Sequence, residues 1–109
     1  MSSRSSPHTD TPRLRLPEYA DAADRELFRA FVRDGRLVAL PPTSFRRVQL
    51  LDHVAQLFEP GVRYPEPVVT KILSAVYDDD ATLRQALVNH GFLSHHHGVY
   101  WRTGGTVDV

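Results

Sequence analysis

The sequence of 109 residues contains no cysteine, and this absence excludes several kinds of chemistry. A chain without a thiol forms no disulfide, no cysteine-ligated metal site and no thiolate nucleophile. Proteins of reducing compartments rarely depend on disulfides. We therefore expect a cytoplasmic location.

Long apolar runs are also missing. No stretch approaches the roughly 20 apolar residues that a membrane-spanning helix needs, and the first residues contain no apolar signal-peptide core. We expect a soluble protein that does not contact a membrane.

An excess of charge of one sign is absent as well, because basic and acidic side chains number 13 each. Such a balance provides no general attraction to polyanions. Any nucleic-acid surface on this protein must therefore be a local patch.

Length and composition predict one small domain between two tails. A chain of this length buries roughly 60–65% of its surface, which permits a single modest core. Residues 1–17 are rich in Ser, Thr and Pro and poor in apolar side chains, so we expect a disordered tail there. The domain should then occupy residues 18–102, and residues 103–109 should form a loose C-terminal tail.

Apolar spacing in the first half of the chain predicts two helices and a short strand. Asp21 can cap the first helix, and Asp34-Gly35 should end it. A short strand is expected over 36–40, before a pair of prolines. The second helix should cover 44–58, where the apolar periodicity is strongest.

Two further helices are predicted between residues 65 and 91. The fourth helix should run from Asp79 to His90, and Gly91 should end it. Only about two residues separate it from the third helix, which is the spacing of a helix-turn-helix. The positions expected to face the core are Val68, Val69, Ile72, Leu73 and Val76 in the third helix and Leu83, Leu87 and Val88 in the fourth.

A β-hairpin is predicted after the fourth helix. Its strands should cover 93–95 and 99–102. Because side chains alternate along a strand, one of Tyr100 and Trp101 should enter the core, and we expect Trp101 to be the buried one. A helix-turn-helix followed by a hairpin is typical of a winged helix. The sequence therefore predicts an α+β, mostly helical winged-helix domain with an extra N-terminal helix and a short strand.

An ordered set of residues connects this chain to a known family. The set comprises Phe31, Asp34, Gly35, Arg36, Leu37, Pro41, Phe58, Gly61, Tyr64, Glu66, Val69, Ile72, Leu73, Thr82, Leu83, Arg84, Leu87, Val88, Gly91, Leu93, Tyr100, Trp101 and Arg102. Through these residues the stretch 27–102 resembles the bacterial domain of unknown function 2087 family. The resemblance implies a small domain, found alone or beside helix-turn-helix domains, that is commonly described as a regulator of transcription. The family usually has arginine where Gln85 and His95 stand here, and glutamate and asparagine where Val68 and Thr70 stand.

The fourth helix and the hairpin form the candidate DNA surface. Three outward positions of the helix should be Thr82, Gln85 and Asn89. Glutamine and asparagine can each form two hydrogen bonds with adenine, and threonine can contact the methyl group of thymine. The alternative is that these polar residues form an ordinary solvated helix face. Other side chains would complete the DNA surface: Arg84 in the groove, Arg46, Arg47, Lys71 and Arg102 on phosphates, and His95 and His96 in the hairpin.

The charge of this surface predicts weak DNA binding. Five permanent cations stand against the four carboxylates of Glu66 and residues 78–80, which leaves a net charge of +1. A specific DNA-binding protein neutralises about 6 to 10 phosphates. We therefore expect DNA binding that is weak or that depends on a dimer, with Phe28 and Phe31 as candidates for part of the dimer interface. The alternative function is a winged-helix module that binds protein and has no role with nucleic acid.

An acidic cluster and a histidine cluster lie near this surface. Asp78-Asp79-Asp80 should cap the fourth helix. His95 and His97 could share a strand face and bind zinc with His90, but no thiolate or placed carboxylate completes the site, and we expect no metal. The histidines could instead become charged near pH 6 and strengthen DNA binding.

No motif predicts an enzyme. The sequence has no nucleophile elbow, no phosphate-binding glycine loop and no paired carboxylates held at a cleft. Asp52 and His53 are adjacent on a predicted helix and point in different directions. We expect no enzymatic activity, no cofactor and no small-molecule ligand.

Overall fold

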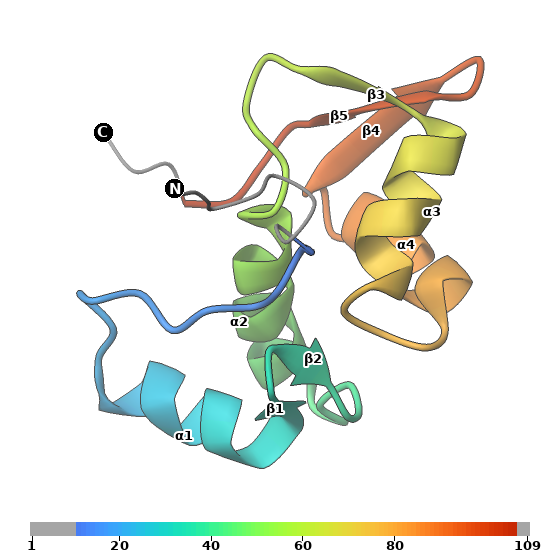
Figure 1. Cartoon of the computed structure of the whole chain (residues 1–109). Coiled ribbons are helices and arrows are strands. Elements are labelled where there is room, and N and C mark those ends of the chain that lie inside the picture. The colour runs from blue at the N-terminus through green and yellow to red at the C-terminus, as the bar shows by residue number, and fades with distance from the viewer. Residues whose placement is uncertain (1–10, 107–109) are drawn as a thin grey trace, which may run out of the picture.

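The structure is a computed structural model that describes residues 11–106 (Figure 1). In this part of the chain four helices and two small antiparallel sheets surround one core. Helix α2 (Ser44–Ala55) lies in the middle, with helix α1 (Ala22–Phe31) and the two-stranded sheet at one end and the three-stranded sheet at the other (Figure 1). This arrangement confirms the predicted α+β class and is consistent with a winged-helix-like fold.

Helix α1 begins at its predicted cap. The side chain of Asp21 accepts a hydrogen bond from the backbone amide of Asp24 at 2.9 Å, and the Asp24 carboxylate accepts one from the amide of Asp21. This reciprocal capping box satisfies two amides that the first turn leaves without partners. The predicted start is therefore confirmed.

The end of α1 differs from the prediction, because a second small hairpin follows it. Strand β1 (Val32–Arg33) pairs with β2 (Arg36–Leu37), and the predicted strand over 36–40 is reduced to β2. Asp34 and Gly35 both have positive φ, at 55° and 79°, which is the conformation of a two-residue hairpin turn. The pair was expected to end a helix and instead forms the turn between β1 and β2.

Helix α2 provides much of the core. Its buried residues are Leu50, Leu51, Val54 and Ala55. The helix was expected to continue through Phe58, but the amides of residues 56–58 bond to carbonyls three residues earlier. This tighter turn ends the α-helix and still leaves Phe58 fully buried.

Helices α3 (Glu66–Ser74) and α4 (Asp80–Asn89) follow one another and pack together, as a helix-turn-helix requires, but residues 75–79 separate them instead of the expected two or so. Val69, Leu73, Val76, Leu83 and Leu87 are fully buried, as expected, and Ile72 and Val88 are partly buried against the core. The expectation for Val68 is wrong, because this side chain is 41% exposed. It lies in the first turn of α3, one position away from the buried stripe.

Gly91 ends α4, as predicted. Its φ is 79°, and its amide donates to the carbonyl of Val88 at 3.1 Å. The amide of Phe92 donates to the carbonyl of Leu87 at 2.8 Å. These two bonds form a Schellman motif, which brings Phe92 back towards the helix and starts the hairpin.

The hairpin gains a third strand. Strands β4 (Leu93–His96) and β5 (Val99–Arg102) pair as predicted, and β3 (Arg63–Pro65), which was expected to be an extended link, pairs with the other edge of β5. The order is β3-β5-β4, and all pairs are antiparallel. The backbone amide of Glu66 donates to the carbonyl of Gly98 at 2.9 Å and so joins the hairpin turn to the start of α3.

The aromatic residue expected to be buried in β5 is the wrong one. Tyr100 is only 7% exposed, whereas Trp101 is partly exposed. The register explains this result, because Tyr100 lies opposite Tyr64 of β3, whose ring packs edge-on against Phe58 at 5.1 Å. Tyr100 is therefore on the face of the sheet that meets the core, and Trp101 is on the other.

Both expected tails contribute contacts to the domain. Leu14 is buried, and its amide donates to the carbonyl of Gly35 at 2.8 Å. The amide and hydroxyl of Thr106 each donate to the carboxylate of Asp52 at 2.7 Å. Packing therefore extends beyond the expected limits of 18 and 102, while residues 1–10 and 107–109 lie outside the described residues.

Two other sequence expectations concern the surface. Phe28 and Phe31, the candidates for a dimer interface, are partly buried against the core. Among residues 11–106, no helix combines the length and apolar character required to cross a bilayer.

Candidate docking surfaces

Helix α4 exposes the three polar residues that were predicted to face outward. Thr82 completes the helix cap, because its amide and hydroxyl donate to the carboxylate of Asp79 at 3.1 and 2.7 Å. The Gln85 amide nitrogen donates to the side-chain oxygen of Asn89 at 2.9 Å. Some of the side-chain groups that would bond to base edges therefore already form hydrogen bonds within the helix or its cap.

The expected role at the helix start holds for two of the three consecutive aspartates, because Asp79 is the N-cap of α4 and Asp80 lies in its first turn. The hydrogen bonds from the Thr82 side chain and backbone hold the pKa of Asp79 below its usual value. Asp78 instead pairs with Arg36 at 2.6 Å, and Asp80 pairs with Arg84. The acidic run therefore serves three different contacts.

Arg84, expected in a DNA groove, is held against the protein. Its guanidinium lies 3.2 Å from the hydroxyl of Thr70 and 3.3 Å from the carboxylate of Asp80. Only 20% of the side chain is exposed. This pairing fixes the side chain along α4 and compensates the only permanent positive charge on that helix.

Two of the four cations expected on phosphates lie away from α4 and the hairpin. Arg46 lies 3.7 Å from Glu26, and Arg47 donates to the carbonyl of Pro41 at 3.1 Å. Both are at the start of α2, beside α1 and far from the hairpin (Figure 1). Arg102 donates to the carbonyls of Phe58, Gly104 and Thr106, and Lys71 is exposed on α3.

The hairpin histidines occupy three different settings. His95 stacks on Tyr100 with the ring centroids 4.9 Å apart, on the core-facing side of the sheet. His96 faces the other side, and His97 lies in the turn with a φ of 52°. The expectation that His95 and His97 share a strand face is therefore wrong. Within residues 11–106, no three His, Asp or Glu side chains are placed to hold a metal ion.

The side of the sheet opposite Tyr100 forms a surface that sequence reasoning missed. We call it the outer sheet face, and helices α2, α3 and α4 all lie on the other side of the sheet (Figure 1). The guanidinium carbon of Arg63 lies 5.1 Å from the centre of the Trp101 ring, which is a cation–π contact. The pairing register defines the members of this face as Arg63, Pro65, Ser94, His96, Val99 and Trp101.

This face combines a partly exposed tryptophan and a stacked arginine with no carboxylate among its six residues. The alternation of Val99, Tyr100 and Trp101 was visible in the sequence. The surface could not be assembled from it, because the assembly requires β3 to be recognised as a strand and paired in register with β5.

Comparison with known proteins identifies the family. The family model described as "Uncharacterized protein conserved in bacteria (DUF2087)" matches residues 36–102, so the chain belongs to this family. The match begins at β2 and ends with β5, and therefore covers the helix-turn-helix and the three-stranded sheet. Comparison with curated proteins and with solved structures gave no match.

Proposed function

We propose that this protein is a winged-helix-type module that binds another protein through the outer sheet face. The observation that carries the proposal is the Arg63–Trp101 pair on the side of the sheet away from the helices. Tryptophan and arginine are enriched among the few residues that dominate the energy of protein interfaces. Val99 and Pro65 supply apolar area beside them.

The chemistry of the partner follows from the charge of this face. Arg63 is its one permanent cation, and it has no carboxylate in the face to compensate it. A complementary partner presents an apolar side chain to Trp101 and a carboxylate to Arg63. Such an arrangement places the apolar contact at the centre and the charged one beside it.

DNA is the second candidate partner, and one observation favours it. The helix-turn-helix leaves Gln85 and Asn89 exposed on α4, where they could reach base edges. The pairing of Arg84 with Asp80 and the distant position of Arg46 and Arg47 argue against strong binding. The DNA function therefore remains the weak or dimer-dependent activity expected from the sequence.

The protein partner is tested by quantitative affinity purification with crosslinking. Tagged full-length chain is compared with a variant that combines Arg63→Glu and Trp101→Ser, and with the control Arg25→Glu on the exposed side of α1. We expect the wild type and the control to recover the same partner, the double variant to recover at least about tenfold less, and the crosslinks to map to β3–β5. Equal recovery by all three folded proteins would overturn the proposal.

DNA binding is tested separately by fluorescence polarisation with random duplex DNA at low and physiological salt. Non-specific DNA-binding proteins have Kd values of roughly 1–100 μM at physiological salt. We expect no saturation below about 100 μM even at low salt, a limit taken from the weak end of that range. Tighter binding that weakens steeply with salt would favour the DNA function instead.

A further inference from the structure

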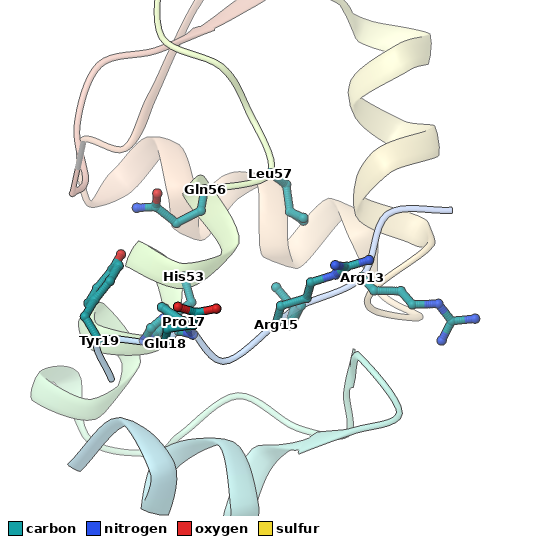
Figure 2. Close-up of a pocket in the computed structure, with 9 residues that line it drawn as sticks. Arg13, Arg15, Pro17, Glu18, Tyr19, His53, Gln56 and Leu57 are labelled. Carbon is teal, nitrogen blue, oxygen red and sulfur yellow. The ribbon is translucent and has the colours of Figure 1, made fainter. Parts of the chain in front are cut away.

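A cleft lies beside the C-terminal end of α2, and it shares no residue with the outer sheet face. The segment 13–19 crosses the end of α2 and leaves a space of about 440 Å³ (Figure 2). This volume is within the usual range of small-molecule sites. The residues that line it are Arg13, Leu14, Arg15, Pro17, Glu18, Tyr19, His53, Gln56 and Leu57.

The wall formed by this segment has a buried residue near each end, and a hydrogen bond ties the Leu14 end to another part of the chain. Leu14 is 5% exposed, and its amide is bonded to Gly35. Ala20 is 7% exposed, and its amide donates to the carbonyl of Pro17 at 3.1 Å. The cleft is therefore formed before any ligand arrives, which reduces the entropy lost on binding.

The floor of the cleft includes a fixed histidine. Only 11% of the His53 side chain is exposed, and its Nε2 lies 3.1 Å from a carboxylate oxygen of Asp24. The ring also packs edge-on against Phe28, with the centroids 4.9 Å apart. Asp24 uses its second oxygen to accept the amide of Asp21, so this carboxylate is already engaged at both oxygens.

The remaining groups of the cleft favour an anion with an apolar body. Leu14, Pro17 and Leu57 form apolar wall, and Tyr19 adds an exposed ring. In Figure 2, Tyr19, His53 and Gln56 lie at one end of the cleft, Arg15 and Leu57 lie nearer the other, and Arg13 extends away from it.

The cationic groups outnumber the free acidic one. Arg13 donates to the carbonyl of Asp34 at 2.9 Å, whereas Arg15 is exposed and has no hydrogen-bond partner within residues 11–106. Within the described part of the chain, Glu18 is the one carboxylate that lines this cleft. The Arg15 guanidinium is therefore the group available to receive a ligand carboxylate.

We propose that this cleft binds a small organic acid, with its apolar body against Leu14, Pro17 and Leu57 and its carboxylate at Arg15. The site is separate from the outer sheet face and does not depend on the proposed protein-binding function. It adds a small-molecule ligand where the sequence indicated none.

The test uses three probes of one shape and different charge: 3-phenylpropionate, 3-phenylpropanamide and 3-phenylpropylamine. Each is titrated into the full-length ¹⁵N-labelled chain and followed by amide chemical shifts. We expect the carboxylate to shift the amides of residues 14–16, 18, 19 and 53–57 with a Kd of about 1 mM or below, and the amide and amine to bind at least about tenfold more weakly. A tenfold difference is the size expected for one charge-assisted hydrogen bond.

Two variants of equal charge change complete the test. Arg15→Gln should weaken 3-phenylpropionate binding by about tenfold, the same charge-assisted contact being lost. Arg25→Gln, on the exposed surface of α1, should leave it unchanged. The proposal is overturned by preference for the amine, by equal binding of all three probes, by shifts confined to other regions, by absence of binding, or by an Arg15→Gln variant that binds like the wild type.

Discussion

The exposed face of α4 and the outer sheet face lie on neighbouring elements of one domain, yet they present different groups to a partner. On α4 the polar groups bond to one another: Thr82 to Asp79, Arg84 to Asp80, and Gln85 to Asn89. On the sheet, Trp101 and Arg63 contact each other and leave their remaining surface open to a partner. The position of a helix in a fold therefore does not establish its role, because its side chains can be used to hold it in place.

The largest expected effect separates the two sides of α4. Leu83 is fully buried, so Leu83→Ala should lower the free energy of unfolding by about 2–5 kcal/mol through lost contacts and a residual cavity. Gln85→Ala, on the exposed side, should change it by less than about 0.5 kcal/mol. Urea unfolding measures both values. Similar losses in the two variants would show that α4 does not have one buried and one exposed face.

The next largest expected effect is on partner affinity, measured for variants of the outer sheet face and of α4. Trp101→Ala should weaken binding of the captured partner by more than about 30-fold, which corresponds to the roughly 2 kcal/mol typical of a central interface residue. The double variant Gln85→Ala/Asn89→Ala should change the affinity by less than about threefold, because rim or non-contacting residues contribute little. Titration calorimetry with the purified partner decides between the surfaces, and a reversed order would move the interface to α4.

A smaller effect is expected on the acid dependence of stability, where Asp24 at the start of α1 is compared with Asp79 at the start of α4. Burial alone raises the pKa of Asp24, but hydrogen bonds from His53 and the amide of Asp21 outweigh it and leave the pKa below its ordinary value. Because the folded-state pKa is depressed, the stabilisation is fully present above the unfolded-state value of about 3.9 and is lost as pH falls through the folded-state pKa.

Asp24→Asn should therefore reduce the loss of stability between pH 5 and pH 2, and at neutral pH it should cost about 1 kcal/mol, the size of one hydrogen bond. Asp79→Asn provides the comparison on α4, where the same direction of pKa shift arises from Thr82 at a fully exposed position. We expect it to flatten the acid dependence less than Asp24→Asn does. Thermal unfolding across this pH range measures the difference, and an unchanged acid slope in Asp24→Asn would contradict it.

The smallest effect concerns the hairpin histidines and DNA. If the outer sheet face binds protein and α4 carries no free permanent charge, fluorescence polarisation with duplex DNA should show no saturation below about 100 μM protein at pH 6, as at pH 8. His95→Ala should behave like the wild type, since this ring stacks on Tyr100. A rise in affinity on acidification that disappears in His95→Ala would restore the DNA interpretation.

The features that could be predicted from the sequence are those encoded by neighbours in the chain. The cap at Asp21, the buried stripe of α4 and the stop at Gly91 depend on residues within one or two turns. The β4–β5 hairpin was also predictable, because its strands are adjacent and joined by a two-residue turn.

What could not be predicted depends on pairing between distant segments. Strand β3 joins the sheet by pairing Tyr64 with Tyr100, a residue 36 positions later in the chain. Without that register, the burial of Tyr100 and the exposure of Trp101 could not be told apart. The same limit applies to the candidate sites, since the cleft requires residues 13–19 to pack beside α2.

The hydrogen bond from the amide of Glu66 to the carbonyl of Gly98 has a mechanical consequence. It fastens the tip of the hairpin to the first turn of α3, so a load applied at the tip is shared with the helix-turn-helix. A partner that displaces the hairpin therefore also pulls on the first turn of α3. Because α3 packs against α4, this displacement can reach the exposed surface of α4.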